Sequence, residues 1–341
     1  MENSLILYCT TCVHCQAGLS TLNKSETTFN CPYCGTVNKV DEVKEIEVYP
    51  PEKIILFKAT EKDFQQAIGN LFVTNDNCAD DIFEKIKFIG EPTIIYLPMH
   101  LFKGEYESDY RCKIKSSGDP RNGNVKGKYS YLVFAFDASY IPKLRDVMKD
   151  FQYDPSMEKY FKPELVANPG YQVITPHFNK VTAWEKEGIA VLWGISKTDA
   201  EKTYGEPLTD FESDLTYDTF EEVGDEFIVP FWIAHYTYNG SRYALVMDGL
   251  GQNAKGDIPE DTKRLKTTKL YEKIRKNAVW AGVVLFVLFW GLTKFIPAII
   301  IGGLAWFGLS FFFKIQLKGI VANARNIRQE AMKNFKGFPK D

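Results

Sequence analysis

The chain has 341 residues, of which 45% are hydrophobic and 25% are charged, and its formal net charge is −3. This composition is ordinary for folded protein, and the length has room for about two modest domains with further segments. The charge is unevenly distributed: residues 263–341 carry 15 Lys and Arg against 3 Asp and Glu, whereas residues 1–262 carry 26 against 41. The acidic part disfavours general nucleic-acid binding, which needs several basic side chains to neutralise phosphates.

Residues 1–42 predict a zinc ribbon. Cys12 and Cys15 form one C-x2-C pair, and Cys31 and Cys34 form a second pair after a gap of 15 residues. Each pair is typical of a tight turn, and four thiolates complete the closed tetrahedral shell that structural zinc prefers. Because a closed shell has no open coordination position, hydrolytic zinc chemistry is not expected.

The other cysteines, Cys9, Cys78 and Cys112, form no evident disulfide framework, which favours a reducing compartment. The N-terminus shows neither the basic region nor the long apolar run of a cleavable signal peptide. Cys9 and His14 lie beside the first cysteine pair, and either could replace one of the four ligands. The all-cysteine set is the simpler prediction, and disulfide pairing is the alternative to a metal.

An acidic stretch and a break at residues 49–51 follow the ribbon, and residues 43–265 are predicted to form a β-rich α+β domain. A capping signal at residues 60–63 opens an amphipathic helix through Phe72. A second short helix is expected over residues 79–88.

From Thr93 onward the chain is rich in aromatic and β-branched residues between turn clusters. The pattern predicts strands at residues 93–102, 106–115, 129–136, 189–193, 227–238 and 242–248. One helix is expected among them, capped at Ser196 or Thr198 and ending near Tyr204.

Two of these strands resemble each other in sequence. Residues 95–102 and 227–234 each combine a proline with an apolar strand, and each leads through a polar turn to a return strand with tyrosine. An internal duplication of a β-hairpin accounts for this likeness, and chance similarity between aromatic strands is the alternative.

Residues 266–313 predict a basic juxtamembrane segment and a two-helix transmembrane hairpin. Residues 278–292 and 295–313 are apolar, and about 18 residues at about 1.5 Å each give roughly 27 Å, close to the thickness of a bilayer core. At a hairpin tip Lys294 reaches water, whereas one long span would bury it at a cost of several kcal/mol. Basic residues flank both ends, which places both flanks and the bulk of the chain on the cytosolic side. A buried helical hairpin in a soluble core is the alternative.

The last segment, residues 314–341, has apolar residues at helical spacing among basic ones. It predicts a basic amphipathic helix on the membrane surface, and a helical continuation of the second span is the alternative. The predicted fold class is therefore α+β, with an N-terminal zinc ribbon, a β-rich middle domain and a C-terminal transmembrane hairpin.

The cysteine pairs, the 102–106 stretch after Pro98, and residues 229–240 followed by Asp248-Gly249 resemble a group of bacterial zinc-ribbon membrane proteins. That group is often labelled as containing a transcription-factor-B-type zinc ribbon. The resemblance lies in scattered short motifs over most of the chain, and it implies architecture without catalytic residues. The sequence departs from the group at residues 248–251, where such proteins carry an Asn-Gly-x-Thr-Gly turn.

No catalytic motif is evident in the sequence. Residues 123–129 are one residue short of a phosphate-binding P-loop and lack its Ser or Thr, so a glycine-rich turn is expected there. His100, His177 and His235 are expected to be structural. Residues 210–226 are expected to form an acidic solvated loop, with a docking surface as the sharper interpretation.

The sequence thus predicts a membrane-anchored, non-enzymatic zinc-ribbon adaptor that recruits a protein partner at the cytosolic membrane face. The expected partners are the lipid bilayer and a protein, without strong nucleic-acid binding. One alternative is a zinc ribbon that contacts nucleic acid near the membrane. The other is an enzyme with a dispersed site built from the histidines and the acidic loop.

Overall fold

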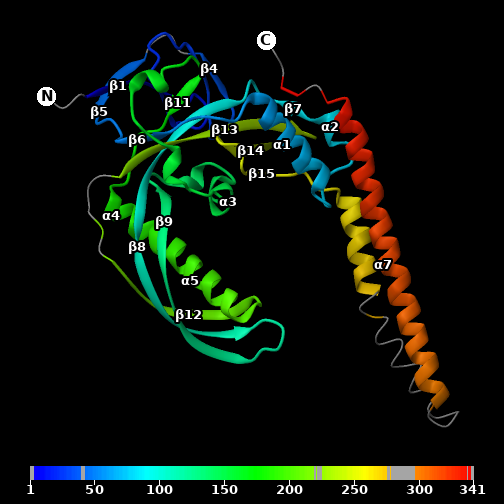
Figure 1. Ribbon diagram of the computed structural model, residues 1–341. Helices are drawn as coiled ribbons and strands as arrows, with labels where there is room; N and C mark the ends of the chain where they lie inside the picture. Colours follow the sequence, from blue (N-terminus) through cyan, green and yellow to red (C-terminus); the bar gives the residue numbers. More distant parts are fainter. Residues whose placement is uncertain are drawn as a thin grey trace.

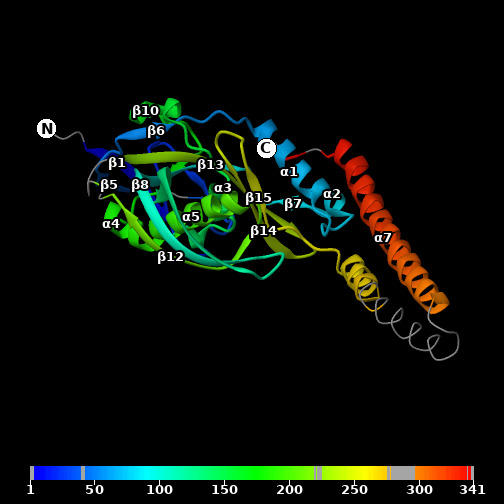
Figure 2. The ribbon, with the colours of Figure 1, turned by 60° about the horizontal axis from the view of Figure 1, so that its bottom comes forward.

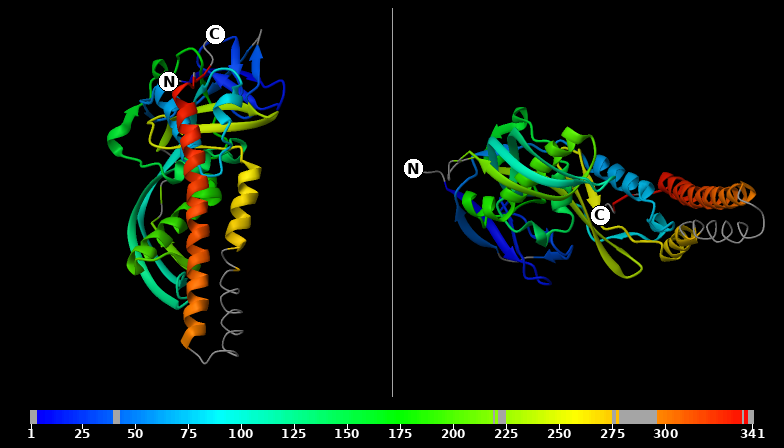
Figure 3. Two further views of the ribbon diagram at one scale, coloured as in Figure 1. Left: turned by 90° about the vertical axis from the view of Figure 1, so that its right-hand side faces the viewer. Right: turned by 90° about the horizontal axis from the view of Figure 1, so that it is seen from below.

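The computed structural model describes residues 4–39, 43–218, 220, 225–274, 277, 296–335 and 337–338. A small N-terminal ribbon lies on one side of a large mixed sheet, and a pair of helices projects from the other side (Figure 1). The turned views show the same arrangement, with the helical pair extending away from the sheet (Figures 2 and 3).

The ribbon consists of two small antiparallel sheets. Its strands are β1 (Leu5–Thr11), β2 (Gly18–Thr21), β3 (Thr28–Asn30), β4 (Val37–Lys39) and β5 (Lys44–Val48). One sheet has the order β2-β1-β5, and β3 pairs with β4. Because β5 pairs with β1, the ribbon sheet continues to Val48. Phe29 is buried with Cys12 and Cys31 in its small core.

The large sheet is built on two long antiparallel strands, β8 (Thr93–Ile114) and β13 (Glu226–Tyr238). Each continues into a hairpin, β8 with β9 (Pro120–Phe134) and β13 with β14 (Ser241–Asp248). Shorter strands complete the sheet: β6 (Lys53–Ile55), β7 (Lys87–Phe88), β10 (Glu158–Tyr160), β11 (Tyr171–Val173), β12 (Leu208–Tyr217) and β15 (Ala254–Gly256).

Helices cover this sheet and form the projecting pair. They are α1 (Glu61–Thr74), α2 (Ile82–Lys85), α3 (Leu144–Lys149), α4 (Lys180–Ala183), α5 (Ile189–Tyr204), a helix over residues 262–274, and α7 (Ile296–Lys333). A π-helical turn, Trp184–Gly188, joins α4 to α5. The predicted capping box of α1 is confirmed, because Thr60 and Asp63 each accept a hydrogen bond from the other's backbone amide.

An approximate twofold axis relates the two long strands. Superposing Pro98 on Pro230 places Leu97 on Val229, and these two residues face each other across the β8–β13 ladder. The neighbouring pairs are crossed: Tyr96 pairs with Pro230, the counterpart of Pro98, and Pro98 pairs with Ile228, the counterpart of Tyr96. Such a register arises when two equivalent strands pair about a twofold axis.

The segments before the two hairpins match as well. α1 is capped by Thr60 and α4 by Asn179, and each cap side chain accepts from the amide three residues further on. β6 pairs in parallel with β13, while β11 pairs in parallel with β8. Each half therefore consists of a strand, a helix and a hairpin, and its strand joins the hairpin of the other half.

Individual hydrogen bonds repeat between the halves. The amide of Ala135 donates to Pro98 at 2.9 Å, and the amide of Gly249 donates to Pro230 at 2.7 Å. Two consecutive amides before α1 donate to the carbonyl of Gly249, and two consecutive amides before α4 donate to that of Ala135. The sequence likeness of residues 95–102 and 227–234 thus corresponds to two matched halves of the domain. The polar turn predicted between strands 93–102 and 106–115 is wrong, because β8 runs as one strand from Thr93 to Ile114 and β9 is its return strand.

Helices cross over between the halves in the same way. α1 packs Phe64 against Trp232 of β13, and α4–α5 packs Trp184 against Phe102 of β8. On the opposite face of the sheet, apolar residues of both long strands, Leu97 and Val229 among them, form the central core.

The predicted strand at residues 189–193 is wrong, because these residues begin α5. A short apolar run does not distinguish a buried strand from a helix, and here the cap of Asn179 starts the helix two turns earlier. Ser196 does not cap a helix, since its hydroxyl lies buried against that of Ser108 at 2.7 Å. The helix expected over residues 79–88 is shorter, with α2 followed by β7.

The glycine-rich stretch at residues 123–129 lies within β9 and is not a turn. Gly123 faces Tyr110 and Gly127 faces Tyr106 in the β8–β9 register. A Cβ at Gly123 would lie 2.6 Å from the hydroxyl oxygen of Tyr110. The glycines therefore make room for tyrosine rings on the facing strand.

The acidic stretch at residues 210–226 is not one loop, because residues up to Tyr217 belong to β12, which pairs with β8. Alternation of acidic residues with Phe211 and Leu215 allows a strand with one face turned toward α5. Residues 219 and 221–224 of the stretch lie outside the described residues.

The predicted transmembrane hairpin is not supported. Its first span, residues 278–292, lies outside the described residues. The second span falls at the start of α7, which continues as one helix to Lys333, far beyond the predicted end at residue 313. Within the described part of the chain, no helix is long and apolar enough to cross a membrane. The membrane localisation predicted with this hairpin is corrected with it, whereas the lipid-bilayer partner stays a prediction.

The last turns of α7 pack on α1 and α2 (Figure 2). Met332 lies against Gly69, where a Cβ would come within 2.5 Å of its terminal carbon. Arg328 is fully buried, and it donates to Asp80 and to three backbone carbonyls at and beyond the C-terminal end of α1. Arg264 also donates to Asp80. A buried charge network therefore attaches the C-terminal helix to α1.

Candidate metal centre

The two cysteine pairs lie in turns of the same geometry. The amide of Gln16 donates to Cys12 at 3.0 Å in the first turn, and the amide of Gly35 donates to Cys31 at 2.8 Å in the second. Gln16 and Gly35 both have a left-handed φ, of 63° and 74°. These tight turns bring the two sulfurs of each pair close together, as the C-x2-C spacing predicts.

The four sulfurs form one cluster. The Sγ atoms of Cys12, Cys15, Cys31 and Cys34 all lie within 4.8 Å of one another. Between the pairs, Cys12 and Cys34 are 3.7 Å apart, and Cys15 and Cys31 are 3.5 Å apart. A tetrahedral shell with metal–sulfur bonds of about 2.3 Å requires sulfurs about 3.8 Å apart. The cluster is therefore at metal-binding distance and compatible with a structural metal.

The alternative ligands lie outside this cluster. Within the described ranges, the group of side chains that could hold a metal contains the four cysteines without Cys9 or His14. Cys9 lies in β1 opposite Ser20, and burial raises the pKa of its thiol.

The protonation of the cysteines also fits a cation. Burial raises the pKa of the Cys12 thiol, but hydrogen bonds from the amides of Cys15 and His14 outweigh it and leave the pKa at about 7. Burial raises the pKa of Cys15 and Cys31. Four sulfurs packed this closely are stable as thiolates only beside a positive charge, which a divalent metal supplies.

The second turn attaches the centre to the large sheet. Gly35 lies directly on His235 of β13, since a Cβ there would come within 2.5 Å of the histidine Cβ. Arg242 of β14 donates to the carbonyl of Cys34 at 3.2 Å. His235 is buried and hydrogen-bonds the backbone of Tyr33, and burial lowers its pKa to about 4. The metal site is thus held rigidly against the β13–β14 hairpin.

A second contact holds the ribbon to β11. Thr21 donates to the carbonyl of Tyr171 at 2.8 Å, and Gln172 donates to the carbonyl of Asn30 at 2.8 Å. The ribbon therefore packs on both the strand and the hairpin of the second half, β11 and β13–β14. Sequence reasoning missed these contacts, because only Gly35 carries a local signal of close approach.

The structure does not bring the three histidines together. His100 lies in β8 beside Glu226, whereas His235 lies nine residues further along β13, about 30 Å away at about 3.3 Å per residue. His177 is exposed in the loop before α4. His100 donates from Nε2 to the carbonyl of Phe178 at 3.1 Å, which is a structural contact.

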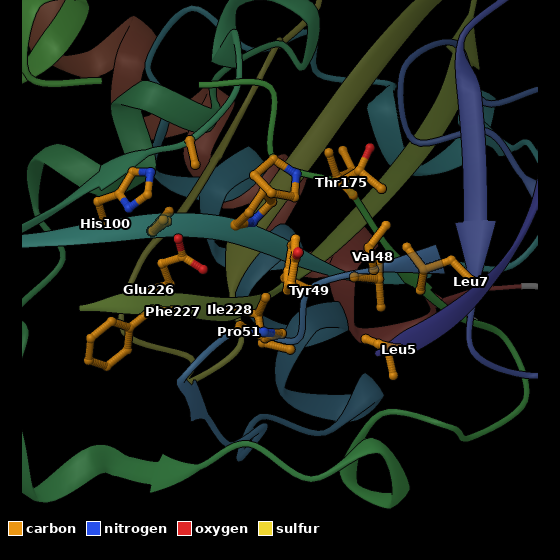
Figure 4. A pocket seen from close by; sticks show the side chains of 16 residues that line it. Leu5, Leu7, Val48, Tyr49, Pro51, His100, Thr175, Glu226, Phe227 and Ile228 are labelled. Atoms are coloured by element: carbon orange, nitrogen blue, oxygen red, sulfur yellow. The ribbon is translucent and has the colours of Figure 1, made fainter. Parts of the chain in front are cut away.

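The cavity beside His100 is small. It lies between the ribbon and the centre of the sheet, with His100 and Glu226 at one end and Leu5 and Leu7 at the other (Figure 4). Its volume is about 40 Å³, whereas pockets for small molecules measure about 300–1,000 Å³. It has room for water-sized molecules.

A wider groove of about 470 Å³ runs between the helix over residues 262–274 and α7. Among its charged lining residues, Arg325 lies 2.9 Å from Asp76, and Arg264 contacts Asp80. The described lining residues include no histidine, cysteine or serine.

Comparisons of the chain with models of known protein families, with curated proteins and with solved structures found no match. The resemblance to bacterial zinc-ribbon membrane proteins stays a prediction that rests on its motifs. Function is therefore argued from the sites of this chain alone.

Proposed function

We propose that this chain is a non-enzymatic adaptor in which a zinc-bound ribbon, held on a duplicated β-domain, binds a protein partner. The observation that carries the proposal is the closed cluster of four cysteines, one turn of which is buried against β13–β14 while the other faces solvent. A closed shell supplies rigidity rather than reactivity.

The metal is proposed to be zinc. A four-sulfur tetrahedral set suits zinc or iron, and soft thiolates disfavour magnesium, calcium and manganese. Iron bound by four thiolates absorbs visible light and undergoes redox change, whereas zinc does neither. Metal analysis and an absorption spectrum of the purified protein therefore separate the two ions.

The proposed contact surface is the first cysteine turn. Val13 is 71% exposed, and His14 and Cys15 beside it are exposed as well. The amide of Val13 donates to the side chain of Asn38 at 2.9 Å, so the turn is ordered although its side chains face solvent. An exposed apolar residue on a rigid support loses little entropy on binding.

Nucleic-acid binding by the ribbon is less well supported. Lys24, one of its few basic residues, pairs with Glu45 at 3.0 Å. Binding to phosphates needs several unpaired basic side chains on one face.

A photo-crosslinking amino acid at position 13 tests the proposal in cells. We expect a discrete protein adduct at this position, and we expect Cys31→Ser to abolish it because the ribbon loses its metal. Position 160 is the matched control, since Tyr160 is 77% exposed on β10 of the large sheet. Equal adducts at positions 13 and 160, or an adduct that survives metal loss, would contradict the proposal.

A further inference from the structure

The N-terminal half of α5 exposes apolar side chains. Ile189, Val191 and Trp193 are 39%, 40% and 36% exposed, while Leu192 between them is fully buried. A helix that is apolar on all sides is normally buried on all sides. This half of α5 therefore has a face that another surface should cover.

The internal duplication shows what happens to the equivalent face of α1. The π-helical turn adds one residue relative to α1, so buried Phe72 corresponds to buried Leu192 and Val73 corresponds to Trp193. On α1 this face is covered by α7, whose Arg328 donates to the carbonyl of Val73 at 3.3 Å. The face that is covered in one half of the domain is open in the other.

The residues of α5 also indicate what fits the open face. Lys186, Ala190, Gly194, Lys197 and Glu201 recur at intervals of three or four residues, so they share one side of the helix. No other group lies within 4 Å of the Cβ position of Gly194. A copy of α7 does not fit, because α7 packs on Gly69 and the corresponding residue on α5 is Ile189.

We propose that a second copy of this chain covers this face, with the two α5 helices antiparallel about the point between Trp193 and Gly194. Trp193 then lies over the open Gly194 of the second copy, and Lys186 lies beside Glu201 of the second copy. Both contacts occur twice about the twofold axis, as a closed dimer requires. The charges at the two ends of the face have opposite signs in this orientation, so Glu201, which lies 4.0 Å from Lys197 of its own copy, gains a second cationic neighbour in Lys186 of the second copy.

This inference goes beyond the proposed adaptor function and does not depend on it. The dimer places two ribbons in one particle, but the α5 face and the cysteine cluster are separate parts of the chain. If crosslinking at position 13 fails, the dimer proposal still stands. If the purified protein is monomeric, the adaptor proposal still stands.

Sedimentation velocity of the purified full-length chain over a dilution series tests the dimer. We expect the unmodified protein to dimerise and Gly194→Arg to be monomeric, because the arginine blocks the close approach of the helices. The same substitution improves helix propensity, so the variant should melt at no lower a temperature. Gly319→Arg is the matched control, since Gly319 is an exposed helical glycine of α7 with nothing within 4 Å, and it should stay dimeric.

A charge exchange tests the orientation. Lys186→Glu should weaken dimerisation by about tenfold or more, and Lys186→Glu with Glu201→Lys should restore it. Glu201 also accepts from the amide of Leu208 at 2.9 Å, so Glu201→Gln, which keeps an acceptor there, should weaken the dimer without harming the fold. A monomeric unmodified protein, a dimeric Gly194→Arg variant, or a double variant no tighter than the single one would each overturn the proposal.

Discussion

The two halves of the duplicated domain share one frame but differ in what is attached to it. The hairpin of the second half, β13–β14, receives the second cysteine turn at His235, and the first-half helix α1 that packs on it is covered by α7. The hairpin of the first half, β8–β9, is longer, at 22 and 15 residues against 13 and 8, and the second-half helix α5 that packs on it has an open outer face.

This difference separates the shared frame from the specialised parts. Contacts that both halves make, such as the paired amides before each helix, position strands and helices. Contacts that lack a counterpart in the other half attach further parts of the chain: Gly35 on His235 attaches the ribbon, and the buried Arg328 network attaches the C-terminal helix. Substitutions at equivalent contacts that both halves make should therefore have similar effects on stability. Substitutions at the attachments of the ribbon or the C-terminal helix should have no equivalent in the other half.

The largest effect is expected on removing a metal ligand. Cys31→Ser should lower the zinc content well below one equivalent and unfold the ribbon, since apparent binding free energies of structural zinc are about 10–16 kcal/mol. Hydrogen exchange should rise in the ribbon and in the β13–β14 turn that it covers, and not at the tip of β8–β9. Cys9→Ser, outside the cluster, is the control. An unchanged zinc content in Cys31→Ser would refute the ligand assignment.

The next largest effect is expected at Arg328, which joins α7 to α1. Arg328→Ala removes a fully buried guanidinium from Asp80 and three carbonyls, and it should lower the free energy of unfolding by about 3–5 kcal/mol. Arg325→Ala is the matched control on the same helix, because its pair with Asp76 is exposed and worth about 1 kcal/mol or less. Urea unfolding measures both, and equal losses would contradict a special role for the buried network.

A smaller effect is expected at a hydrogen bond that both halves make with different donor side chains. Trp232 donates from its indole to the carbonyl of Ala59 at 3.2 Å, and His100 donates to the equivalent carbonyl of Phe178. Trp232→Phe and His100→Phe each remove the donor and should cost about 1–3 kcal/mol in thermal or urea unfolding. His177→Phe, in an exposed position, should stay within about 0.5 kcal/mol. A loss confined to one half would argue against the equivalence of the two contacts.

The parts predicted correctly from the sequence are those that local spacing determines. The turns around Cys12 and Cys31 follow from two residues between ligands, and the start of α1 follows from Thr60 and Asp63. Each signal lies within a few residues, so no knowledge of the rest of the fold is needed.

The errors and omissions concern pairings between distant segments. The apolar run at residues 189–193 became helical because of the cap at Asn179 and the packing on β8–β9, which its own composition does not reveal. The pairing of β6 with β13, the pairing of β11 with β8 and the docking of Gly35 on His235 join residues that lie between 77 and 200 positions apart. Local patterns carry no information about such contacts.

The smallest expected effect is a pH dependence of the free energy of unfolding that arises from His100 and not from its counterpart Trp232. Burial lowers the pKa of His100; the hydrogen bond to Phe178 and the charge of Glu226 oppose this shift, and the charge of Lys180 adds to it. Trp232, the equivalent residue, does not titrate, so acid sensitivity from this contact belongs to one half. The unfolded chain binds a proton at an ordinary histidine pKa of about 6.5, whereas the folded chain binds it only at lower pH.

Stability should therefore fall as pH drops below about 6.5 toward the folded pKa of His100, and the loss should level off below that value. Carboxylates titrate in acid as well, so the useful quantity is the difference between the protein and His100→Gln, whose amide keeps a donor for Phe178 without a titrating group. Urea unfolding between about pH 7 and pH 5 should show the gap between the two shifting in favour of the glutamine variant as pH falls. Parallel pH profiles would mean that His100 is not held neutral in the fold. The equivalence of His100 with Trp232 would then rest only on the hydrogen bonds that repeat between the halves.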